Sequence, residues 1–406
     1  MQCAVCKGRG FCGKKCPILN NFKELRPRIK EEFSGSSPPE IFVGRHNYPN
    51  VFTGIISPAE FGNTEKLSMP EIWHSENASI NDIISYRSRM IYSRFVSSIK
   101  PASQSRFLSV MQEVAIASKP TNMEFKLEKK PSAKMQIDNR MPIIGNPAPL
   151  KSARFQENIK TEKKVDYLVN DTDVKATTAM KELYKASISV SSIIKILSAG
   201  LLGEKKNRKL VPTRWAITAT DSSISNEMID KIRYYPIISD YLLFNSEYLG
   251  NHYEIFLIPS TFSYEVIEAK MSGSIWNPSS GKADDCKTVI MQDYENWYGR
   301  KDYAENVGGG YYAPRLAISE YLSAIKRQAA VLVLRECRPE YWAPCGVGIL
   351  RECTRSAMRS TPEHFSTLSE AFGAAQKRMR LPIKFLSEKS MLLKNVQQQK
   401  KLSSFF

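Results

Sequence analysis

The stretch HYEIFLIPSTFSYEVIEAK, residues 252–270, decides the fold class that the sequence predicts. It contains two strand candidates, HYEIFLIP (252–259) and SYEVIEAK (263–270), joined by a short turn of Pro, Ser and Thr. A third strand candidate, AAVLVLREC (329–337), follows a segment with helical spacing, PRLAISEYLSAIKRQ (314–328). Because strands and helices follow one another without a regular strand–helix–strand period, we expect an α+β fold with a mixed or antiparallel sheet.

Hydrophobic periodicity predicts further elements on both sides of this stretch. IFVGRHNYPNVFTGII (41–56) is typical of a β-hairpin around the turn Tyr48-Pro49-Asn50. Asp221 is expected to cap a helix that follows it, and Pro314 is expected at the first position of its own helix. The other predicted elements are helices within 80–98 and 173–200, the latter ending near Gly200, and strands at 163–171, 214–221 and 346–353.

Composition divides the chain into four expected regions. Proline is frequent in 100–150, which we therefore expect to be irregular and to contain a boundary. The four regions are a zinc-binding element with a polar connector (1–38), the N-terminal part of the core (39–150), a central α+β domain (151–383) and a flexible tail (384–406).

The net charge of +17 over 406 residues favours a polyanionic partner, because neutralising phosphates releases counterions. Charge alone does not distinguish DNA from RNA or from an anionic membrane. The sequence has no run of about 18 apolar residues that could span a bilayer, and its polar, Cys-rich start lacks the apolar centre of a signal peptide. We expect a cytoplasmic protein, associated with the nucleoid and not with a membrane.

Four cysteines near the N-terminus have the spacing of a metal site: Cys3, Cys6, Cys12 and Cys16. Four thiolates suit tetrahedral Zn²⁺, and the intervening glycines let the backbone turn tightly around the ion. A site with four protein ligands has no open position for water, so this zinc would be structural. An iron–sulfur cluster and four unrelated free thiols are the alternatives.

Three later cysteines, Cys337, Cys345 and Cys353, are expected to be buried and to act as small hydrophobic residues. If 346–353 pairs back on 329–337 as a hairpin, Cys337 lies opposite Cys353. A second metal site containing Cys345 and His364 is the alternative.

The polar residues of the central region suggest an anion-binding pocket. A glycine triplet ahead of a helix can cradle a phosphate, since unpaired amides and the helix dipole both favour an anion, and arginine binds phosphate in a bidentate manner. The candidate anion-binding residues are Arg45, Arg214, Arg300, Gly308, Gly309, Gly310 and Arg315. A scatter of arginines over the surface and an ordinary flexible turn are the alternatives.

Two pairs of residues admit metal-dependent catalysis. Asp293 and Glu295 would share one face of an extended strand, which suits Mg²⁺ and hence a nuclease, although a solvated strand face explains them too. Glu268 and Lys270 faintly resemble the carboxylate and lysine of restriction-type nucleases. No Ser/His/Asp set, Walker loop or dinucleotide fingerprint is present, so no catalytic residue is assigned.

The last eight residues, QKKLSSFF (399–406), place three apolar side chains on one face of a single helical turn. Leu402, Phe405 and Phe406 form the apolar plug, and Gln399 is left to hydrogen-bond. This pattern resembles the box through which proteins bind the sliding clamp (PCNA). Nearby lysines would complement an acidic clamp surface, whereas a tail docked on its own core is the alternative.

Several segments occur along the chain in a fixed order: the N-terminal cysteines, FVGRHNYPNV (42–51), MPIIGNPAPL (141–150), VDYLVNDTDVKA (165–176), KLVPTRWAITATD (209–221), GGGYYAPRLAISEYL (308–322) and the terminal box. Together they resemble the archaeal Nre DNA-repair family, NreA type, over essentially the whole chain. The resemblance implies a zinc-containing N-terminus, a central domain of undefined reaction, and recruitment by the sliding clamp to sites of DNA repair. Lys270 departs from the aromatic residue that we expect at its position.

Two functions from different classes follow. The first is a clamp-tethered, zinc-containing DNA-repair factor that acts by binding DNA. The second is an enzyme brought to DNA by the same tail, either a metal-dependent nuclease or a transferase that acts on a phosphate-bearing substrate.

Overall fold

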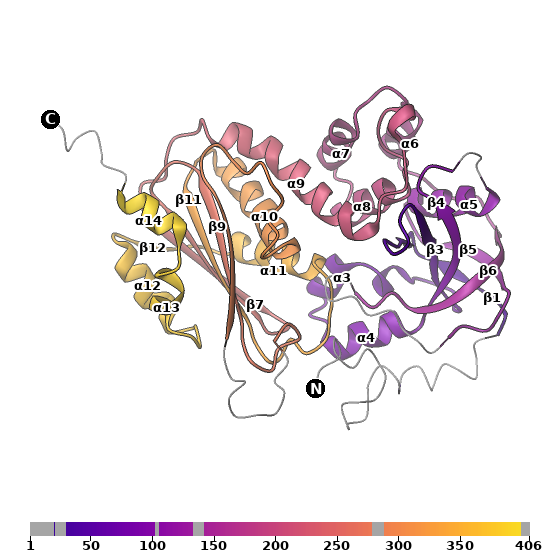
Figure 1. The fold of residues 1–406 in the computed structure, drawn as a ribbon, viewed down its shortest axis with the longest axis horizontal. Coiled ribbons are helices and arrows are strands. Elements are labelled where there is room, and N and C mark those ends of the chain that lie inside the picture. The colour runs from indigo at the N-terminus through magenta and orange to yellow at the C-terminus, as the bar shows by residue number, and fades with distance from the viewer. Residues whose placement is uncertain (1–19, 21–29, 102–104, 133–141, 278–287, 399–406) are drawn as a thin grey trace. The chain divides into compact units, whose positions relative to one another are not determined.

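A computed structural model describes residues 20, 30–101, 105–132, 142–277 and 288–398 of the chain (Figure 1). These residues belong to two compact units. The first unit comprises the chain up to Ile224 together with Ala343–Gly348, and the second comprises Ser225–Trp342 together with the chain from Ile349 onward. Each unit is built around one six-stranded mixed sheet, in agreement with the predicted α+β class.

The first unit has the strand order β1-β5-β6-β4-β3-β2, in which β4 and β6 are parallel and all other neighbours are antiparallel. The backbone of Ser36 in β1 donates to the carbonyl of Glu60, just beyond β3, so the sheet curls back on itself. Its elements are β1 (Glu32–Ser37), β2 (Ile41–Val43), β3 (Asn50–Pro58), η2 (Glu65–Leu67), α3 (Pro70–Ser75), α4 (Ile80–Ser88), β4 (Met90–Ser98), α5 (Arg106–Ile116), β5 (Thr121–Leu127), β6 (Asn146–Phe155), α6 (Lys163–Asn170), α7 (Ala176–Lys185), α8 (Val190–Ser198) and η3 (Lys205–Asn207).

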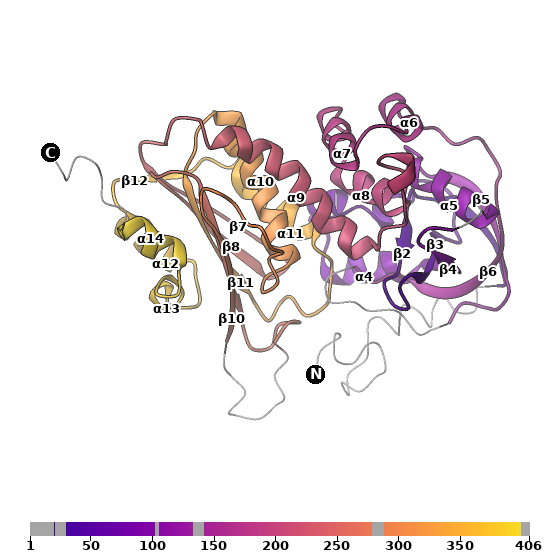
Figure 2. The same cartoon turned by 45° about the horizontal axis from the view of Figure 1, so that its top comes forward.

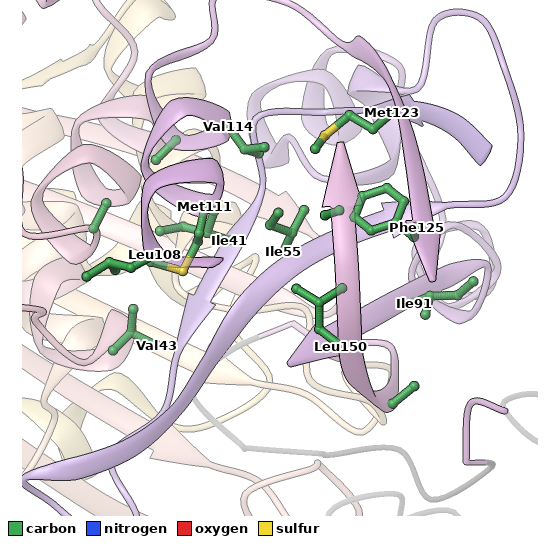
Figure 3. Close-up of a cluster of buried hydrophobic side chains, with 14 of the residues drawn as sticks. Ile41, Val43, Ile55, Ile91, Leu108, Met111, Val114, Met123, Phe125 and Leu150 are labelled. Carbon is green, nitrogen blue, oxygen red and sulfur yellow. The ribbon is translucent and has the colours of Figure 1, made fainter. Parts of the chain in front are cut away.

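Helix α5 fills the concave side of this sheet (Figure 3). Its apolar residues recur at three- and four-residue intervals, so they form one stripe that faces the strands. In the figure, Leu108, Met111 and Val114 point toward Ile41 and Ile55 of β2 and β3. These side chains are almost fully buried, and this packing is the hydrophobic core of the first unit.

The long helix α9 (Thr213–Ile232) begins in the first unit and ends in the second. The second unit has the strand order β10-β9-β11-β8-β7-β12, with β9 and β11 parallel and the other neighbours antiparallel. Its elements are β7 (Tyr241–Tyr248), β8 (Asn251–Ile258), β9 (Ser263–Lys270), β10 (Val289–Glu295), α10 (Gly309–Ile325), β11 (Ala330–Cys337), α11 (Gly348–Arg359), β12 (Glu363–Phe365), α12 (Leu368–Gln376), α13 (Ile383–Ser387) and α14 (Met391–Gln398).

Helices cover both faces of the second sheet (Figures 1 and 2). Helices α10 and α11 lie on one face, where the Tyr264 hydroxyl donates to the carbonyl of Tyr311. Helices α12, α13 and α14 lie on the other face and contribute to its apolar cluster. Because both faces are covered, the central strands β8, β9 and β11 are buried along almost their whole length.

The strands predicted from the opening stretch are confirmed. β8, β9 and β11 coincide within one residue with the predicted segments, and the predicted hairpin is formed by β2 and β3. The helices expected within 173–200 are α7 and α8, and Gly200 follows them with a positive φ of 73°.

Three predicted strands are instead helical: 163–171 is α6, 214–221 lies in α9, and 346–353 overlaps α11. In α6, Val165 and Leu168 are buried while Tyr167 is 62% exposed. The two buried residues are three positions apart, as in a helix, but in so short a segment this spacing is hard to distinguish from the alternation of a strand. Asp221 is therefore a buried residue inside α9 and caps no helix.

Other boundaries also differ from the sequence prediction. The described residues of the segment 100–150 include α5, β5 and the start of β6 and are not irregular, because the prolines fall outside α5 and β5. The helix expected over 80–98 ends at Ser88 and continues as β4, and β1 lies in the predicted connector. Pro314 is the sixth residue of α10, whose first turn is formed by glycines and tyrosines.

Part of the predicted tail is folded. Helix α14 packs through Leu392 and Leu393, and its first turn is held by the carboxylate of Glu265 on β9. Glu265 accepts hydrogen bonds from the backbone amides of Met391 and Leu392 and from the hydroxyl of Ser390. The sequence did not predict this short amphipathic helix, because the mixture of lysine, serine and glutamine around it hides the spacing of its few apolar residues. Within the described part of the chain, no helix is long and apolar enough to cross a membrane.

Candidate nucleic-acid interface

The turn of the β2–β3 hairpin projects from the first unit and is fixed by backbone hydrogen bonds. The amide of Gly44 donates to the carbonyl of Phe52 at 2.8 Å, and the amide of Asn50 donates to that of Asn47 at 2.8 Å. Asn47 has a φ of +62°, a left-handed conformation that asparagine tolerates better than most residues. The turn residues Arg45, His46 and Tyr48 are consequently exposed on an ordered loop.

The start of α9 lies against this hairpin and brings a second aromatic ring to it. The hydroxyl oxygen of Thr213 accepts a hydrogen bond from the amide of Val43 at 2.9 Å. Two residues later, the Trp215 ring lies 5.5 Å from the Tyr48 ring, measured between centroids. Both side chains are exposed, Tyr48 by 44% and Trp215 by 45%. Residues far apart in sequence thus form an aromatic pair that faces solvent.

The outward face of β3 and β4 adds an arginine stacked on a third ring. Phe52 is opposite Val96 in the antiparallel register, and Arg94 is opposite Gly54. The guanidinium carbon of Arg94 lies 4.2 Å from the centroid of the Phe52 ring, which is a cation–π contact. Phe52 and Val96 remain exposed, by 36% and 60%.

We call the residues Arg45, His46, Tyr48, Phe52, Arg94 and Trp215 the hairpin surface. The stretches that supply it, residues 41–56, 90–101 and 212–220, contain no aspartate or glutamate. Exposed rings, arginine and a lack of nearby acidic residues in the sequence are the features with which proteins bind nucleic acid: cations contact phosphates and rings stack on bases.

The predicted anion-binding arginines are divided between the two units. Arg45 belongs to the hairpin surface, and Arg214 precedes Trp215 on α9. Arg315 is in the second unit, where it forms a buried bidentate ion pair with Glu295, with N–O distances of 2.7 and 3.0 Å. One of its terminal nitrogens also donates to Ser225 and Asn226. Arg315 therefore stabilises the fold and presents no free donor pair to a phosphate.

Arg300 and the glycine triplet are also committed to the fold. Arg300 donates to the backbone carbonyls of Tyr294, Asp302 and Tyr303 and lies 3.3 Å from Asp293. A Cβ atom added to Gly310 would lie 3.0 Å from the carboxylate of Glu268. The Arg335 guanidinium would lie 3.2 Å from the same Cβ, so the start of α10 is buried against the Glu268–Arg335 ion pair, which fills the space that a phosphate cradle would need.

The two carboxylates considered for magnesium have protein partners. Asp293 accepts a hydrogen bond from the amide of Val307 at 2.8 Å and pairs with Arg300, and Glu295 pairs with Arg315. Burial raises the pKa of Asp293, although these donors partly oppose the shift. Among the described residues, no three acidic, histidine or cysteine side chains are grouped to hold a metal ion. Asp293 and Glu295 fix the segment between β10 and α10.

Glu268 and Lys270 of β9 belong to a buried network centred on Arg335 of β11. Arg335 pairs with Glu268 and donates to the side-chain oxygen of Asn251 at 2.5 Å. Lys270 lies 3.4 Å from Glu268. Burial alone would lower the pKa of Arg335, but the Glu268 carboxylate outweighs it and the pKa is raised. This network neutralises charge inside the sheet.

Cys337, Cys345 and Cys353 are buried thiols, as predicted. Cys337 is opposite Asn251 and Lys270, not opposite Cys353, because 348–359 is helical. Burial raises the pKa of the Cys337 and Cys353 thiols to about 12, so both stay protonated at neutral pH.

A pocket of about 200 Å³ in the first unit lies beside the start of α8. Its lining includes Ser189, Ser192, Glu65 and Glu162. Ser189 already caps α8 by accepting from the amide of Ser192 at 3.0 Å, and the two carboxylates oppose an anion. This pocket contains none of the predicted site residues.

Sequence reasoning missed Phe52, Arg94 and Trp215. The available signal was the absence of acidic residues from the stretches 41–56 and 90–101, combined with aromatic residues at alternate strand positions. Two other groups of predicted site residues lie outside the described residues: the metal ligands Cys3, Cys6, Cys12 and Cys16, and the clamp-binding residues Gln399, Leu402, Phe405 and Phe406.

Comparison with known proteins gives matches along nearly the whole chain. Residues 11–277 match the family model described as Archaeal Nre, N-terminal, and residues 295–405 match Archaeal Nre, C-terminal. The DNA repair protein NreB of Archaeoglobus fulgidus is 36% identical over 402 residues, covering 98% of each chain. The DNA repair protein NreA of the same organism is 38% identical and covers 93% of this chain and 94% of its own.

The DNA repair protein NreA of Haloferax volcanii is 33% identical over 396 residues, which are 95% of this chain and 93% of the relative. No solved structure matches the chain.

The buried network generates a stability prediction. Glu268→Gln should destabilise the second unit by about 3–5 kcal/mol, because Arg335 is left as a buried cation without its charged partner. The double variant Glu268→Gln/Arg335→Met should recover part of the loss, since the buried guanidinium is removed while Lys270 still lacks its partner Glu268. Chemical denaturation monitored by circular dichroism measures both values. Lys126→Met, which breaks an exposed ion pair with Glu32, is the control and should have little effect. Equal stability of Glu268→Gln and wild type would contradict the assignment.

Proposed function

The chain belongs to the archaeal Nre family, and on this premise we propose that it is a DNA-repair factor that contacts DNA through the hairpin surface. The family relatives from two organisms carry the name DNA repair protein, which supports the pathway. The hairpin surface supports the mode of action, and the single observation that carries it is the exposed Tyr48–Trp215 pair, with the exposed Arg45 in the same turn as Tyr48.

Binding would combine two physical contributions. Arg45 and Arg94 supply charge to phosphates, and each phosphate neutralised releases counterions, so this contribution weakens as salt rises. Tyr48 and Trp215 supply ring faces, and such stacking accepts any base. Since Tyr48 is held on a fixed turn and Trp215 on a helix, little side-chain order has to be gained on binding.

The alternative of a magnesium-dependent nuclease receives no support from the contacts of Asp293 and Glu295. Each carboxylate already faces an arginine, and placing a divalent cation there would put two positive groups against each other. We therefore propose a function by binding and assign no reaction.

We further propose that the segment 399–406 tethers this protein to the sliding clamp (PCNA). The support is the pattern of Gln399, Leu402, Phe405 and Phe406, which follows in the sequence on α14, a helix anchored to the sheet through Glu265. A ligand peptide that follows an anchored helix directly needs no long linker to order.

The N-terminal cysteines are proposed to hold one structural Zn²⁺. The support is the donor set itself, because four thiols within fourteen residues match the ligand number and softness that zinc prefers. The bound metal would stabilise the N-terminal segment and supply no open coordination position for chemistry.

The first prediction concerns DNA. Arg45→Ala should weaken binding to a labelled oligonucleotide and lower the slope of log affinity against log salt by about one, because one phosphate contact is lost. Trp215→Ala should weaken binding by about 1–3 kcal/mol with an unchanged slope. Fluorescence anisotropy over a salt series measures both. Lys185→Ala, on α7, is the matched cation control. If Arg45→Ala and Trp215→Ala both bind like wild type, or if Lys185→Ala lowers the affinity and the slope as much as Arg45→Ala, the hairpin surface is not the interface.

The second prediction concerns the clamp. Deleting residues 399–406 should abolish binding to the sliding clamp while leaving α14 and the rest of the fold in place. The peptide alone should bind with a micromolar Kd, because ordering a tail offsets much of the apolar burial. Calorimetry with intact protein, truncated protein and the variant Leu402→Ala/Phe405→Ala/Phe406→Ala decides the matter. Unchanged binding of the truncated protein would refute the tether.

The third prediction concerns the metal. Elemental analysis of freshly purified protein should find about one zinc per chain, and Cys3→Ser/Cys16→Ser should lose it, because a site with two thiolates binds zinc far more weakly. A metal-free native protein, or iron–sulfur absorbance in the visible range, would show that the spacing was misinterpreted.

A further inference from the structure

A second exposed aromatic group lies in the second unit, where residues that follow the end of α9 meet the loop between β10 and α10. We call Tyr234, Trp297 and Tyr298, with Arg233, the aromatic platform. Tyr298 is 84% exposed and Tyr234 is 78% exposed, the two highest values among the exposed large hydrophobic residues of the described chain. A contiguous group of exposed rings, unlike rings scattered singly over a surface, marks an interaction site.

The rings of the platform are held in a defined arrangement. The Trp297 ring lies edge to face with Tyr234 at 6.1 Å and with Tyr298 at 5.3 Å, at interplanar angles of 85° and 89°. The guanidinium of Arg233 lies 5.8 Å from the centre of the Trp297 ring. Both tyrosine rings thus contact the Trp297 ring, and most of the surface of each tyrosine stays exposed to solvent.

Arg300 fixes the loop that carries Trp297 and Tyr298, because its guanidinium donates to the backbone carbonyls of Tyr294, Asp302 and Tyr303. Gly299 adopts a φ of +83°, and a Cβ there would lie 3.0 Å from a terminal nitrogen of Arg233. Glycine therefore permits the turn and the close approach of Arg233. Asn296 accepts from the amide of Tyr298 at 3.0 Å and closes the turn. The platform is a built feature of the fold.

The charges around the platform nearly cancel. Arg233 pairs with Asp230 at 3.2 Å, Arg300 pairs with Asp293 at 3.3 Å, and exposed Lys301 is followed by exposed Asp302. A ligand held here gains little from counterion release, in contrast to one on the hairpin surface. Any affinity for nucleic acid must come from stacking, which requires bases that are not paired in a duplex.

We propose that the aromatic platform is a stacking site for unpaired bases of single-stranded DNA. This inference rests on the proposed DNA-repair function and adds the form of DNA that is recognised. Tyr298 and Tyr234 each present a ring to one base, and Trp297 with Arg233 holds them in position. Of the other exposed residues in the loop, Asn296, Lys301 and Asp302 are polar and Tyr303 adds a further ring, so apart from its rings the loop surface is polar, whereas the centre of a protein interface is apolar.

The test uses the full chain and two probes of equal length, a fluorescein-labelled oligothymidylate and a labelled duplex. Tyr298→Ala/Tyr234→Ala should weaken binding of the single strand by about tenfold or more and leave duplex binding and the salt slope unchanged. Tyr298→Phe/Tyr234→Phe should restore binding, because the ring is kept. Tyr167→Ala on α6 is the matched control. Tyr167 is 62% exposed and its ring centroid lies 5.4 Å from Nζ of Lys164, so it is a solvent-facing tyrosine beside a cation but outside the platform.

The outcomes separate this inference from the proposed function. If the platform variant binds the single strand like wild type while Arg45→Ala and Trp215→Ala lose affinity, the platform is no base-binding site and the function stands. If the platform variant loses the duplex as strongly as the single strand, selective stacking is refuted. If wild type binds neither probe, both the proposed function and this inference are overturned, and a protein partner is the remaining explanation for the exposed rings.

Discussion

The structure of the second unit depends on the complete burial of its central strand, β11. All eight residues from Ala330 to Cys337 are buried, yet the strand carries the adjacent charges Arg335 and Glu336. Consecutive strand residues point to opposite faces, so each face must neutralise one charge. Glu268 does so for Arg335, and Arg338 with the amides of Arg380 and Leu381 does so for Glu336. Unpaired, either charge would cost several kcal/mol.

This constraint explains why the polar residues that suggest catalysis in the sequence are structural. Glu268, Asp293 and Glu295 each face an arginine inside the unit, and Glu265 holds the first turn of α14. The buried carboxylates of this unit therefore hold strands and helices together. The groups left to meet a ligand are rings and cations on the surface, which favours a protein that acts by binding.

The sequence predicted the parts of the fold in which local pattern and tertiary environment agree. β8, β9 and β11 are long apolar runs between turn signals, and the β2–β3 hairpin has a clear turn. It failed where a short segment fits both periods, as in α6 and at the start of α9, because burial by distant residues decided between them. Arg45 and Tyr48 were noticed through their turn, whereas Trp215 joined them only through a contact spanning more than 160 residues, consistent with the Val43–Thr213 hydrogen bond.

The central claim is that exposed aromatic and basic surfaces contact DNA directly. Photo-cross-linking tests it most directly: a single-stranded oligonucleotide containing bromodeoxyuridine is irradiated with the full chain, and the cross-linked peptides are identified by mass spectrometry. The account predicts adducts on the peptides that contain Tyr48 and Trp215, and on those of the aromatic platform, which is proposed to stack on unpaired bases. A stable complex whose adducts fall only on other elements, such as α7 or α12, would contradict it.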